Sequence, residues 1–297
     1  MNRALIFGAN GQDGHYLSEL CKLKGIEPIG ISRSGDSIHC DISKFDQVEQ
    51  LVKQYLPTYI FHLAAHSTTR HDAVFENHET ISTGCINLLE AVKRHCHSAK
   101  VFITGSGVQF KNKGNPISEK DEFEASSAYS VARIQSVFAA RYYRSLGIRT
   151  YIGYLFHHES PYRKPTHVSQ KIALAVQRIA VGSNEILDLG DISVKKEWTF
   201  AGDVTEAIMM LVQQENIFEA VIGSGKAYSI EHWLECCFSL IDKNWQKYVK
   251  LQEGFKAEYP VLISNPVIMQ SIGWKPKITI DELASMMVAL EKNNERV

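Results

Sequence analysis

A glycine-rich turn near the N-terminus most constrains what this chain can fold into. The apolar run 4–7 ends at Gly8, and Gly11 and Gly14 follow just before apolar residues take up helical spacing. Gly8 can adopt a backbone conformation closed to larger residues, and Gly11 allows close approach to a pyrophosphate. Gly14 allows the helix to lie against the strand, and the helix N-terminus offers free N–H groups to phosphates. The pattern predicts a dinucleotide site; the simpler interpretation is a turn that only ends a strand.

Apolar runs and amphipathic segments alternate through the first half of the chain. Strands are predicted at 27–32, 59–65, 100–104 and 148–156, and helices at 43–55, 80–97 and 126–146. Short turns connect these segments, which is typical of an α/β fold with a doubly wound parallel Rossmann sheet.

The alternation becomes irregular after residue 156. We predict helices at 168–181, 203–213, 230–241 and 280–290, and strands at 185–189 and 220–224. We therefore expect a dinucleotide-binding Rossmann domain at 1–155, to which about 199–225 returns. A smaller, interwoven C-terminal domain, formed by 156–198 and 226–297, would bind substrate beyond the carboxyl ends of the strands.

The overall composition excludes several classes of function. The net charge is −1, with 44% hydrophobic and 22% charged residues, so no strong field would attract nucleic acid or a membrane. No leader segment and no apolar stretch of about 20 residues is evident. The six cysteines form no C-x-x-C pair and His95-Cys96-His97 lacks a partner pair, so we expect reduced thiols, a cytoplasmic location and no metal.

The end of the second predicted strand indicates which dinucleotide is bound. An acidic residue there takes the ribose hydroxyls of NAD, whereas an arginine accommodates the 2′-phosphate of NADP. This chain has Ser32, Arg33 and Ser34 at that point, and Asp36 comes later. NADP is therefore favoured and NAD remains possible; the alternative is that Arg33 is only a solvated turn residue.

The 126–146 segment is apolar nearly all round, more than a helix on one face of a sheet needs. We predict a homodimer through a helix bundle formed by the 80–97 and 126–146 helices. The alternative is burial of the extra apolar face under the C-terminal part of the same chain.

Hydride transfer at an alcohol carbon needs an acid/base group at the oxygen. A tyrosine can serve if a cation lies near it, and a residue four positions along a helix lies on the same face. Of the twelve tyrosines only Tyr129 has a Lys or Arg at that spacing, namely Arg133. Ser106, at the end of the preceding strand, is the best second hydroxyl for the reacting oxygen.

Several motifs together resemble the extended short-chain dehydrogenase/reductase (epimerase/dehydratase) family, in its GDP-mannose 4,6-dehydratase and GDP-4-keto-6-deoxymannose reductase branch. The resemblance covers essentially the whole chain. Its motifs are Gly8-x-x-Gly11-x-x-Gly14, His62-Leu-Ala-Ala65, Asn87-Leu-Leu-Glu-Ala-Val92, Tyr129-x-x-x-Arg133, Leu155-Phe-His-His-Glu-Ser-Pro161, Val168-Ser-Gln-Lys-Ile172, Leu189-Gly-Asp-Ile-Ser-Val-Lys-Lys-Glu-Trp198 and Gly273-Trp-Lys-Pro276.

The resemblance implies an NAD(P)-dependent oxidoreductase that acts on a nucleotide-diphospho-sugar, most simply a GDP-linked one. Catalysis would involve Ser106, Tyr129 and Arg133. Cofactor contacts are expected from Gly8, Asn10, Gly11, Gln12, Asp13, Gly14, Arg33, Asp41, Ile42, Leu63, Ala64, Ala65, Tyr129 and Arg133. Substrate contacts are expected from His157, Glu159, Val168, Lys171, Lys196 and Lys256.

Two positions depart from the family pattern. Arg133 stands where the family has lysine; it keeps the positive charge, but its planar fork is not equivalent. Val108 stands where the dehydratases have the glutamate that removes the C5 proton and helps expel the C6 oxygen. A valine cannot transfer a proton, so the sequence favours C4-keto reduction over dehydration. A 4,6-dehydratase with a substitute acid, and a degenerate cofactor-binding homologue, remain as alternatives.

Overall fold

A seven-stranded parallel sheet forms the centre of the molecule. The computed structural model describes residues 2–66, 68–255 and 257–289. The strands are β1 (Arg3–Phe7), β2 (Glu27–Ser32), β3 (Ile38–His39), β4 (Tyr59–His62), β5 (Lys100–Ser106), β6 (Arg149–Leu155) and β11 (Glu219–Ile222). Their order is β11-β6-β5-β4-β1-β2-β3, and every neighbouring pair is parallel. The predicted doubly wound parallel Rossmann sheet is confirmed.

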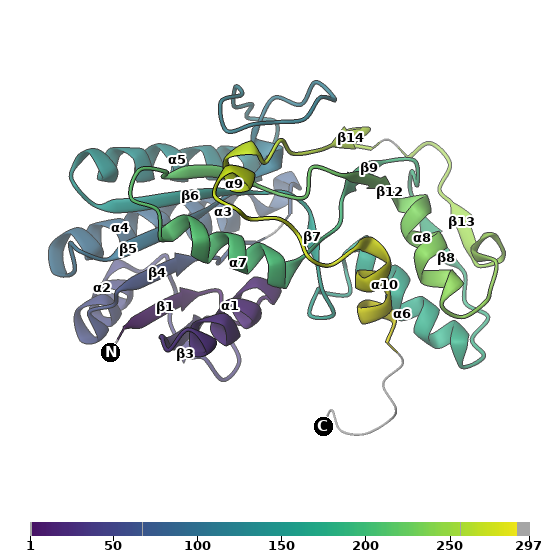
Figure 1. The fold of residues 1–297 in the computed structure, drawn as a ribbon, viewed down its shortest axis with the longest axis horizontal. Helices are drawn as coiled ribbons and strands as arrows, with labels where there is room; N and C mark the ends of the chain where they lie inside the picture. The colour runs from purple at the N-terminus through teal and green to yellow at the C-terminus, as the bar shows by residue number, and fades with distance from the viewer. Residues whose placement is uncertain (1, 67, 256, 290–297) are drawn as a thin grey trace.

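Helices cover both faces of this sheet (Figure 1). One face carries α1 (Gln12–Leu23), α7 (Ala201–Val212) and the short α9 (Val267–Ser271). The other face carries α2 (Phe45–Tyr55), α4 (Gly84–His95) and α5 (Ala128–Ser145). Because the strands are buried on both faces, their sequences are near-continuous apolar runs, which is why they could be recognised.

A smaller unit lies beyond the carboxyl ends of the strands, at the right of Figure 1. Its core lies among α6 (Val168–Ala180), α8 (Ile230–Ser239) and α10 (Ile280–Val288), where Trp198 and Trp233 stack with ring centroids 4.7 Å apart. Small sheets complete it: β7 (His158–Glu159) with β10 (Thr199–Phe200), β8 (Leu187–Leu189) with β13 (Val249–Leu251), and β9 (Lys195–Glu197) with β12 (Ala227–Ser229) and β14 (Val261–Leu262).

The segment predicted as a helix at 80–97 differs from the prediction at its start. Helical structure begins earlier, with α3 (Val74–Asn77), and passes through a π-helical segment, His78–Thr83, before α4. The edge strand β3 and several two- or three-residue strands were not predicted, because segments this short show no periodicity. Leu290, where we expected the last helix to end, lies outside the described residues.

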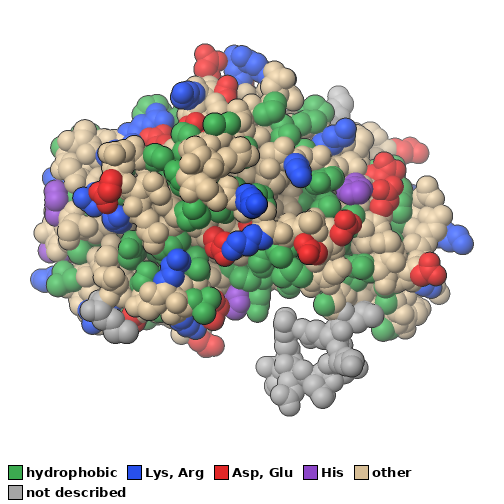
Figure 2. Space-filling model, in the orientation of Figure 1, with side chains coloured by type: hydrophobic (Ala, Val, Ile, Leu, Met, Phe, Trp, Pro, Cys, Tyr) green, Lys and Arg blue, Asp and Glu red, His purple; other side chains and the backbone are tan. Residues whose placement is uncertain are grey.

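Charged side chains of both signs are interspersed over the face seen in Figure 2. This distribution agrees with the net charge of −1. Among the described residues, no helix is long and apolar enough to cross a membrane.

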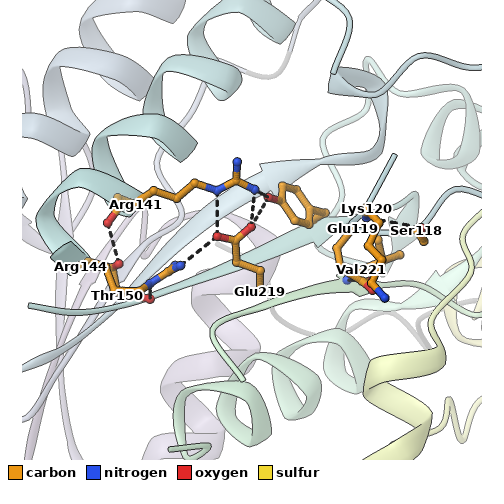
Figure 3. A network of polar contacts seen from close by, with 10 residues as sticks. Ser118, Glu119, Lys120, Arg141, Arg144, Thr150, Glu219 and Val221 are labelled. Carbon is orange, nitrogen blue, oxygen red and sulfur yellow. Dashed lines mark hydrogen bonds and ion pairs between the residues drawn. The ribbon is translucent and has the colours of Figure 1, made fainter. Parts of the chain in front are cut away.

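Glu219 connects α5 to the last two strands of the sheet (Figure 3). It accepts two hydrogen bonds from Arg141, at 2.9 and 2.7 Å, and one from Arg144 at 2.9 Å. The Tyr154 hydroxyl donates a further bond at 2.7 Å. Burial by itself raises the pKa of Glu219, but the two arginines and the tyrosine outweigh it and lower the pKa to about 2.

We predict that Glu219→Gln lowers the free energy of unfolding by about 2–3 kcal/mol near neutral pH, because two guanidinium groups lose their charged acceptor. The wild-type carboxylate stabilises the fold above its unfolded pKa of 4.5, and this contribution is lost as the pH falls toward about 2. Denaturant titration at several pH values measures both effects.

Glu215→Gln is the matched control, because Glu215 is 61% exposed and pairs only on the surface with Lys100 and Arg149. It should change the free energy of unfolding by less than about 1 kcal/mol. Equal losses in the two variants would contradict the stabilising role of the Glu219 network.

Candidate active site

The glycine turn has the geometry that the sequence predicts. Gly8 has a φ of +94°, and a Cβ there would lie 2.7 Å from the backbone nitrogen of Ala64. A Cβ on Gly14 would lie 2.5 Å from the Gly8 carbonyl oxygen, so the helix can lie this close to the turn only with glycine. No side chain caps the α1 N-terminus at Gly11, which leaves N–H groups available to a diphosphate.

The carboxyl end of β5 and the first turns of α5 bring the three predicted catalytic residues to one cavity. Ser127 caps α5, accepting a hydrogen bond from the backbone nitrogen of Ser130 at 3.1 Å, and so places Tyr129 in the first turn. Arg133 follows one turn later, with its guanidinium carbon 5.0 Å from the centroid of the Tyr129 ring. Ser106, Tyr129 and Arg133 all line the same cavity.

Arg133 is held more rigidly than a flexible lysine would be. Its side chain is 3% exposed, and Nη1 donates to the carbonyl of Thr104 at 2.6 Å. The buried imidazole of His62 lies close by, and burial, followed by the Arg133 charge, lowers its pKa to about 3. The Arg133 Nε has no hydrogen-bond partner among the described residues, so a polar ligand in the cavity could supply one. The free N–H groups at the start of α1 and the Arg133 guanidinium are therefore hydrogen-bond donors that fit a dinucleotide.

Two cavities lie next to each other at the mouth of the sheet. The first measures about 610 Å³ and contains the three predicted catalytic residues; the second measures about 380 Å³ and lies against α6 and β8. Thr166, Glu258 and Tyr259 line both. A dinucleotide in the first cavity could thus face a second ligand that extends into the other.

The loop after β6 supplies an unforeseen cation to the first cavity. Arg163 lines it, with Nε 3.2 Å from a Glu159 carboxylate oxygen and Nη2 3.1 Å from Nδ1 of His167. His157 also lines it, and burial, with a smaller effect of Lys196, lowers its pKa well below the usual value. The sequence offered no spacing signal for Arg163 beyond the donor-rich composition of its loop.

Two predicted substrate residues lie beside this cavity and do not line it. Lys196 is 8% exposed and lies over the Trp198 ring at 5.0 Å, while Glu159 is 1% exposed. Burial lowers the pKa of Lys196, and the nearby Glu159 partly opposes this effect. Neither residue belongs to the lining of either cavity among the described residues.

The other predicted substrate residues divide between the second cavity and the undescribed part of the chain. Val168 and Lys171 line the second cavity, and Lys171 Nζ also donates to the carbonyl of Asp188 at 2.6 Å. Lys256 lies outside the described residues.

The predicted cofactor residues lie in three groups. Asp13, Leu63, Ala65, Tyr129 and Arg133 line the first cavity; Gly8, Gly11, Gln12 and Gly14 belong to the turn and the start of α1 beside it, and Ala64 packs against Gly8. Asn10 and Arg33 lie toward the end of β2, where Asn10 accepts a hydrogen bond from Ser37 at 2.8 Å. Asp41 and Ile42 follow β3, and the Ile42 side chain is buried against Gly84.

Val108 lines the first cavity, so the departure from the family pattern falls at the site itself. The carboxylates in the same lining are Asp13 and Glu258. Asp13 is paired with His158 at 2.9 Å, whereas Glu258 has only the hydroxyl of Thr69 at 3.4 Å as a partner among the described residues. Glu258 carries no recognisable sequence signal, because it is a single acid in an irregular loop.

The fold, together with a family match that spans nearly the whole chain, defines a nicotinamide-dependent enzyme of the extended short-chain dehydrogenase/reductase class that acts on nucleotide sugars. The sequence model of the GDP-mannose 4,6 dehydratase family matches residues 5–287, and the chain belongs to that family. It is 30% identical to GDP-mannose 4,6 dehydratase 2 of Arabidopsis thaliana, over 96% of this chain and 85% of that protein.

Solved structures support the fold. MoeE5 in complex with UDP-glucuronic acid and NAD superposes with a TM-score of 0.86 at 18% identity, covering 97% of this chain and 98% of that one. RMD from Pseudomonas aeruginosa complexed with NADPH gives a TM-score of 0.83 at 20% identity, covering 97% of each chain.

Proposed function

We propose that this protein catalyses a 4,6-dehydration of a GDP-linked hexose of the GDP-mannose type. The family match and the names of its relatives support dehydration, although Val108 alone favours reduction. The observation that carries the proposal is Glu258, a carboxylate that lines the same cavity as Ser106 and Tyr129. It could act in place of the glutamate that the dehydratases have at the position of Val108.

Three side chains, Tyr129, Ser106 and Glu258, have separate roles in the proposed reaction. Tyr129 takes the proton of the C4 hydroxyl, and Ser106 donates a hydrogen bond to the same oxygen. Gly8, Gly11 and Arg133 would hold the nicotinamide dinucleotide, which would supply reversible hydride transfer between C4 and C6. The C4 ketone acidifies C5; Glu258 removes the C5 proton and passes it to the C6 hydroxyl, which leaves as water. A proton returned to C5 balances the one that Tyr129 took from the C4 hydroxyl, and because the hydride is returned to C6 the reaction is redox-neutral overall.

We predict that the wild-type protein converts GDP-mannose in D₂O, without added reduced cofactor, to a 4-keto-6-deoxy product carrying deuterium at C5. Glu258→Gln should lower this rate by about 100-fold or more, because it removes the acid/base group. Product and label are measured by NMR. Glu253→Gln, in the same exposed loop but outside both cavities, should retain the wild-type rate.

Other outcomes lead to different assignments. Product formation by Glu258→Gln at the wild-type rate would remove Glu258 from the mechanism. C4-keto reduction is the second candidate, favoured by Val108. Consumption of NADPH with a 4-keto sugar, but no product from GDP-mannose alone, would support it. Cofactor binding without any turnover would support a degenerate homologue.

We propose NADP as the preferred cofactor. Arg33 is exposed just beyond β2, and no hydrogen bond or ion pair joins it to another described residue, so its guanidinium is available to a 2′-phosphate. Arg33→Ala should weaken NADPH binding by about tenfold or more and leave NADH binding unchanged. Fluorescence titration with both cofactors measures this; equal losses, or a wild-type preference for NADH, would contradict the assignment.

We propose that the protein is a homodimer through α4 and α5. Ile86, Val131, Phe138 and Tyr142 are 48%, 39%, 57% and 60% exposed, so the described part of the C-terminal half does not cover them. Such an apolar patch is typical of a protein–protein interface.

The cytoplasmic location stays a prediction.

The dimer proposal predicts that Phe138→Glu combined with Tyr142→Glu converts the protein to a monomer in light-scattering measurements. The reason is that two carboxylates would be buried without partners in the interface. Leu23→Glu, which alters an 85% exposed residue on α1, should leave the mass unchanged. A monomeric wild-type protein would contradict the proposal.

A further inference from the structure

Asp13, one of the predicted cofactor residues, places a carboxylate at the start of α1. It lies in the first turn of the helix that follows the glycine turn, and its side chain lines the first cavity. The same helix N-terminus is the place where the fold offers N–H groups to a diphosphate. A carboxylate there would repel the phosphates unless a positive charge compensates it.

His158, the first residue of β7, is placed to provide that charge. Its Nε2 lies 2.9 Å from the Asp13 carboxylate, and its Nδ1 lies 2.7 Å from the carbonyl oxygen of Phe156. Both partners can only accept hydrogen bonds, so both ring nitrogens donate only when the imidazole is protonated. The side chain of His158 is 11% exposed, which limits competition from water.

Further contacts join the same two segments. Gln12 Nε2 donates to the carbonyl of His158 at 3.1 Å, and Ser160 Oγ donates to Gln12 Oε1 at 2.9 Å. The loop that carries His157 into the cavity is therefore fastened to the first turn of α1 at neighbouring points. A change in the Asp13–His158 pair would therefore alter both the start of α1, beside the glycine turn, and the loop that carries His157.

We propose that His158 is a positioning residue whose imidazolium cancels the charge of Asp13 at the cofactor diphosphate site and fastens the substrate loop to α1. The inference rests on the proposed dinucleotide at the glycine turn, and it holds whichever reaction follows. Without the imidazolium, the negative charge of Asp13 would repel the diphosphate and weaken cofactor binding.

The surrounding charges agree with this assignment. Burial by itself raises the pKa of Asp13, but His158, Arg163 and Arg133 outweigh it and the net pKa is lowered. Burial by itself lowers the pKa of His158, but Asp13 outweighs burial and the nearby Arg163, and the net pKa is raised. The neighbouring His157 has a pKa well below its usual value and remains neutral. Of these groups, His158 is the one that faces the Asp13 carboxylate directly and whose charged form Asp13 stabilises.

The test measures NADPH binding by fluorescence titration in the absence of sugar. His158→Gln should weaken binding by about tenfold or more, because it leaves the Asp13 charge uncompensated. The double variant Asp13→Asn with His158→Gln should recover most of the affinity, although it restores no charge-assisted contact. His15→Gln, the same substitution on α1 outside the cavity lining, should bind within about twofold of the wild type.

The pH profile separates charge compensation from a purely structural role. Wild-type affinity should fall as the pH rises through the raised pKa of His158, whereas Asp13→Asn alone should show a flatter profile. Because Asp13→Asn keeps an acceptor for His158, it tests the proposal even if His158→Gln folds poorly.

Three results would overturn the inference. These are unchanged binding by His158→Gln, no recovery in the double variant, or equal pH profiles for the wild type and Asp13→Asn. A wild-type protein that binds neither NADPH nor NADH would overturn it together with the cofactor assignment. Failure of dehydration alone would leave these binding results intact, so the two proposals fail in distinguishable ways.

Discussion

The parallel alignment of the sheet is the constraint on which the site depends. Because every neighbouring pair of strands in the seven-stranded sheet is parallel, all of the carboxyl ends meet at one edge. The glycine turn follows β1, Ser106 ends β5, and the His157 loop follows β6. Residues more than 100 positions apart in the chain therefore line one cavity, and the smaller unit covers the same edge.

Charge compensation is the second requirement of this edge. Buried or half-buried cations gather there, and each has a partner that limits the cost of desolvation. Arg133 donates to the Thr104 carbonyl, Arg163 lies against Glu159, and His158 lies against Asp13. The cavity thus presents cations to a diphosphate, two of them paired with carboxylates and Arg133 with a neutral carbonyl.

Much of the nucleotide-binding half could be predicted from sequence, because its signals are local. The glycine spacing, the apolar strands and the Tyr129–Arg133 spacing each lie within one segment. The substrate side could be predicted less well. Lys196 was expected to contact substrate but lies over Trp198, whereas the unpredicted Arg163 lines the cavity. A match by sequence position does not show whether Lys196 or Arg163 lines the cavity, because the packing of Lys196 over the Trp198 ring depends on the tertiary structure.

The sequence by itself determined the Rossmann sheet, the glycine turn, the family, and the absence of an acid at Val108, because these depend on residue types and short-range order. Only the tertiary structure decided that Glu258 shares the cavity with Tyr129 and that His158 meets Asp13. Those pairs are separated by 129 and 145 residues respectively in the chain. No local pattern encodes their proximity; it follows from how the irregular segments after β6 fold back over the sheet edge.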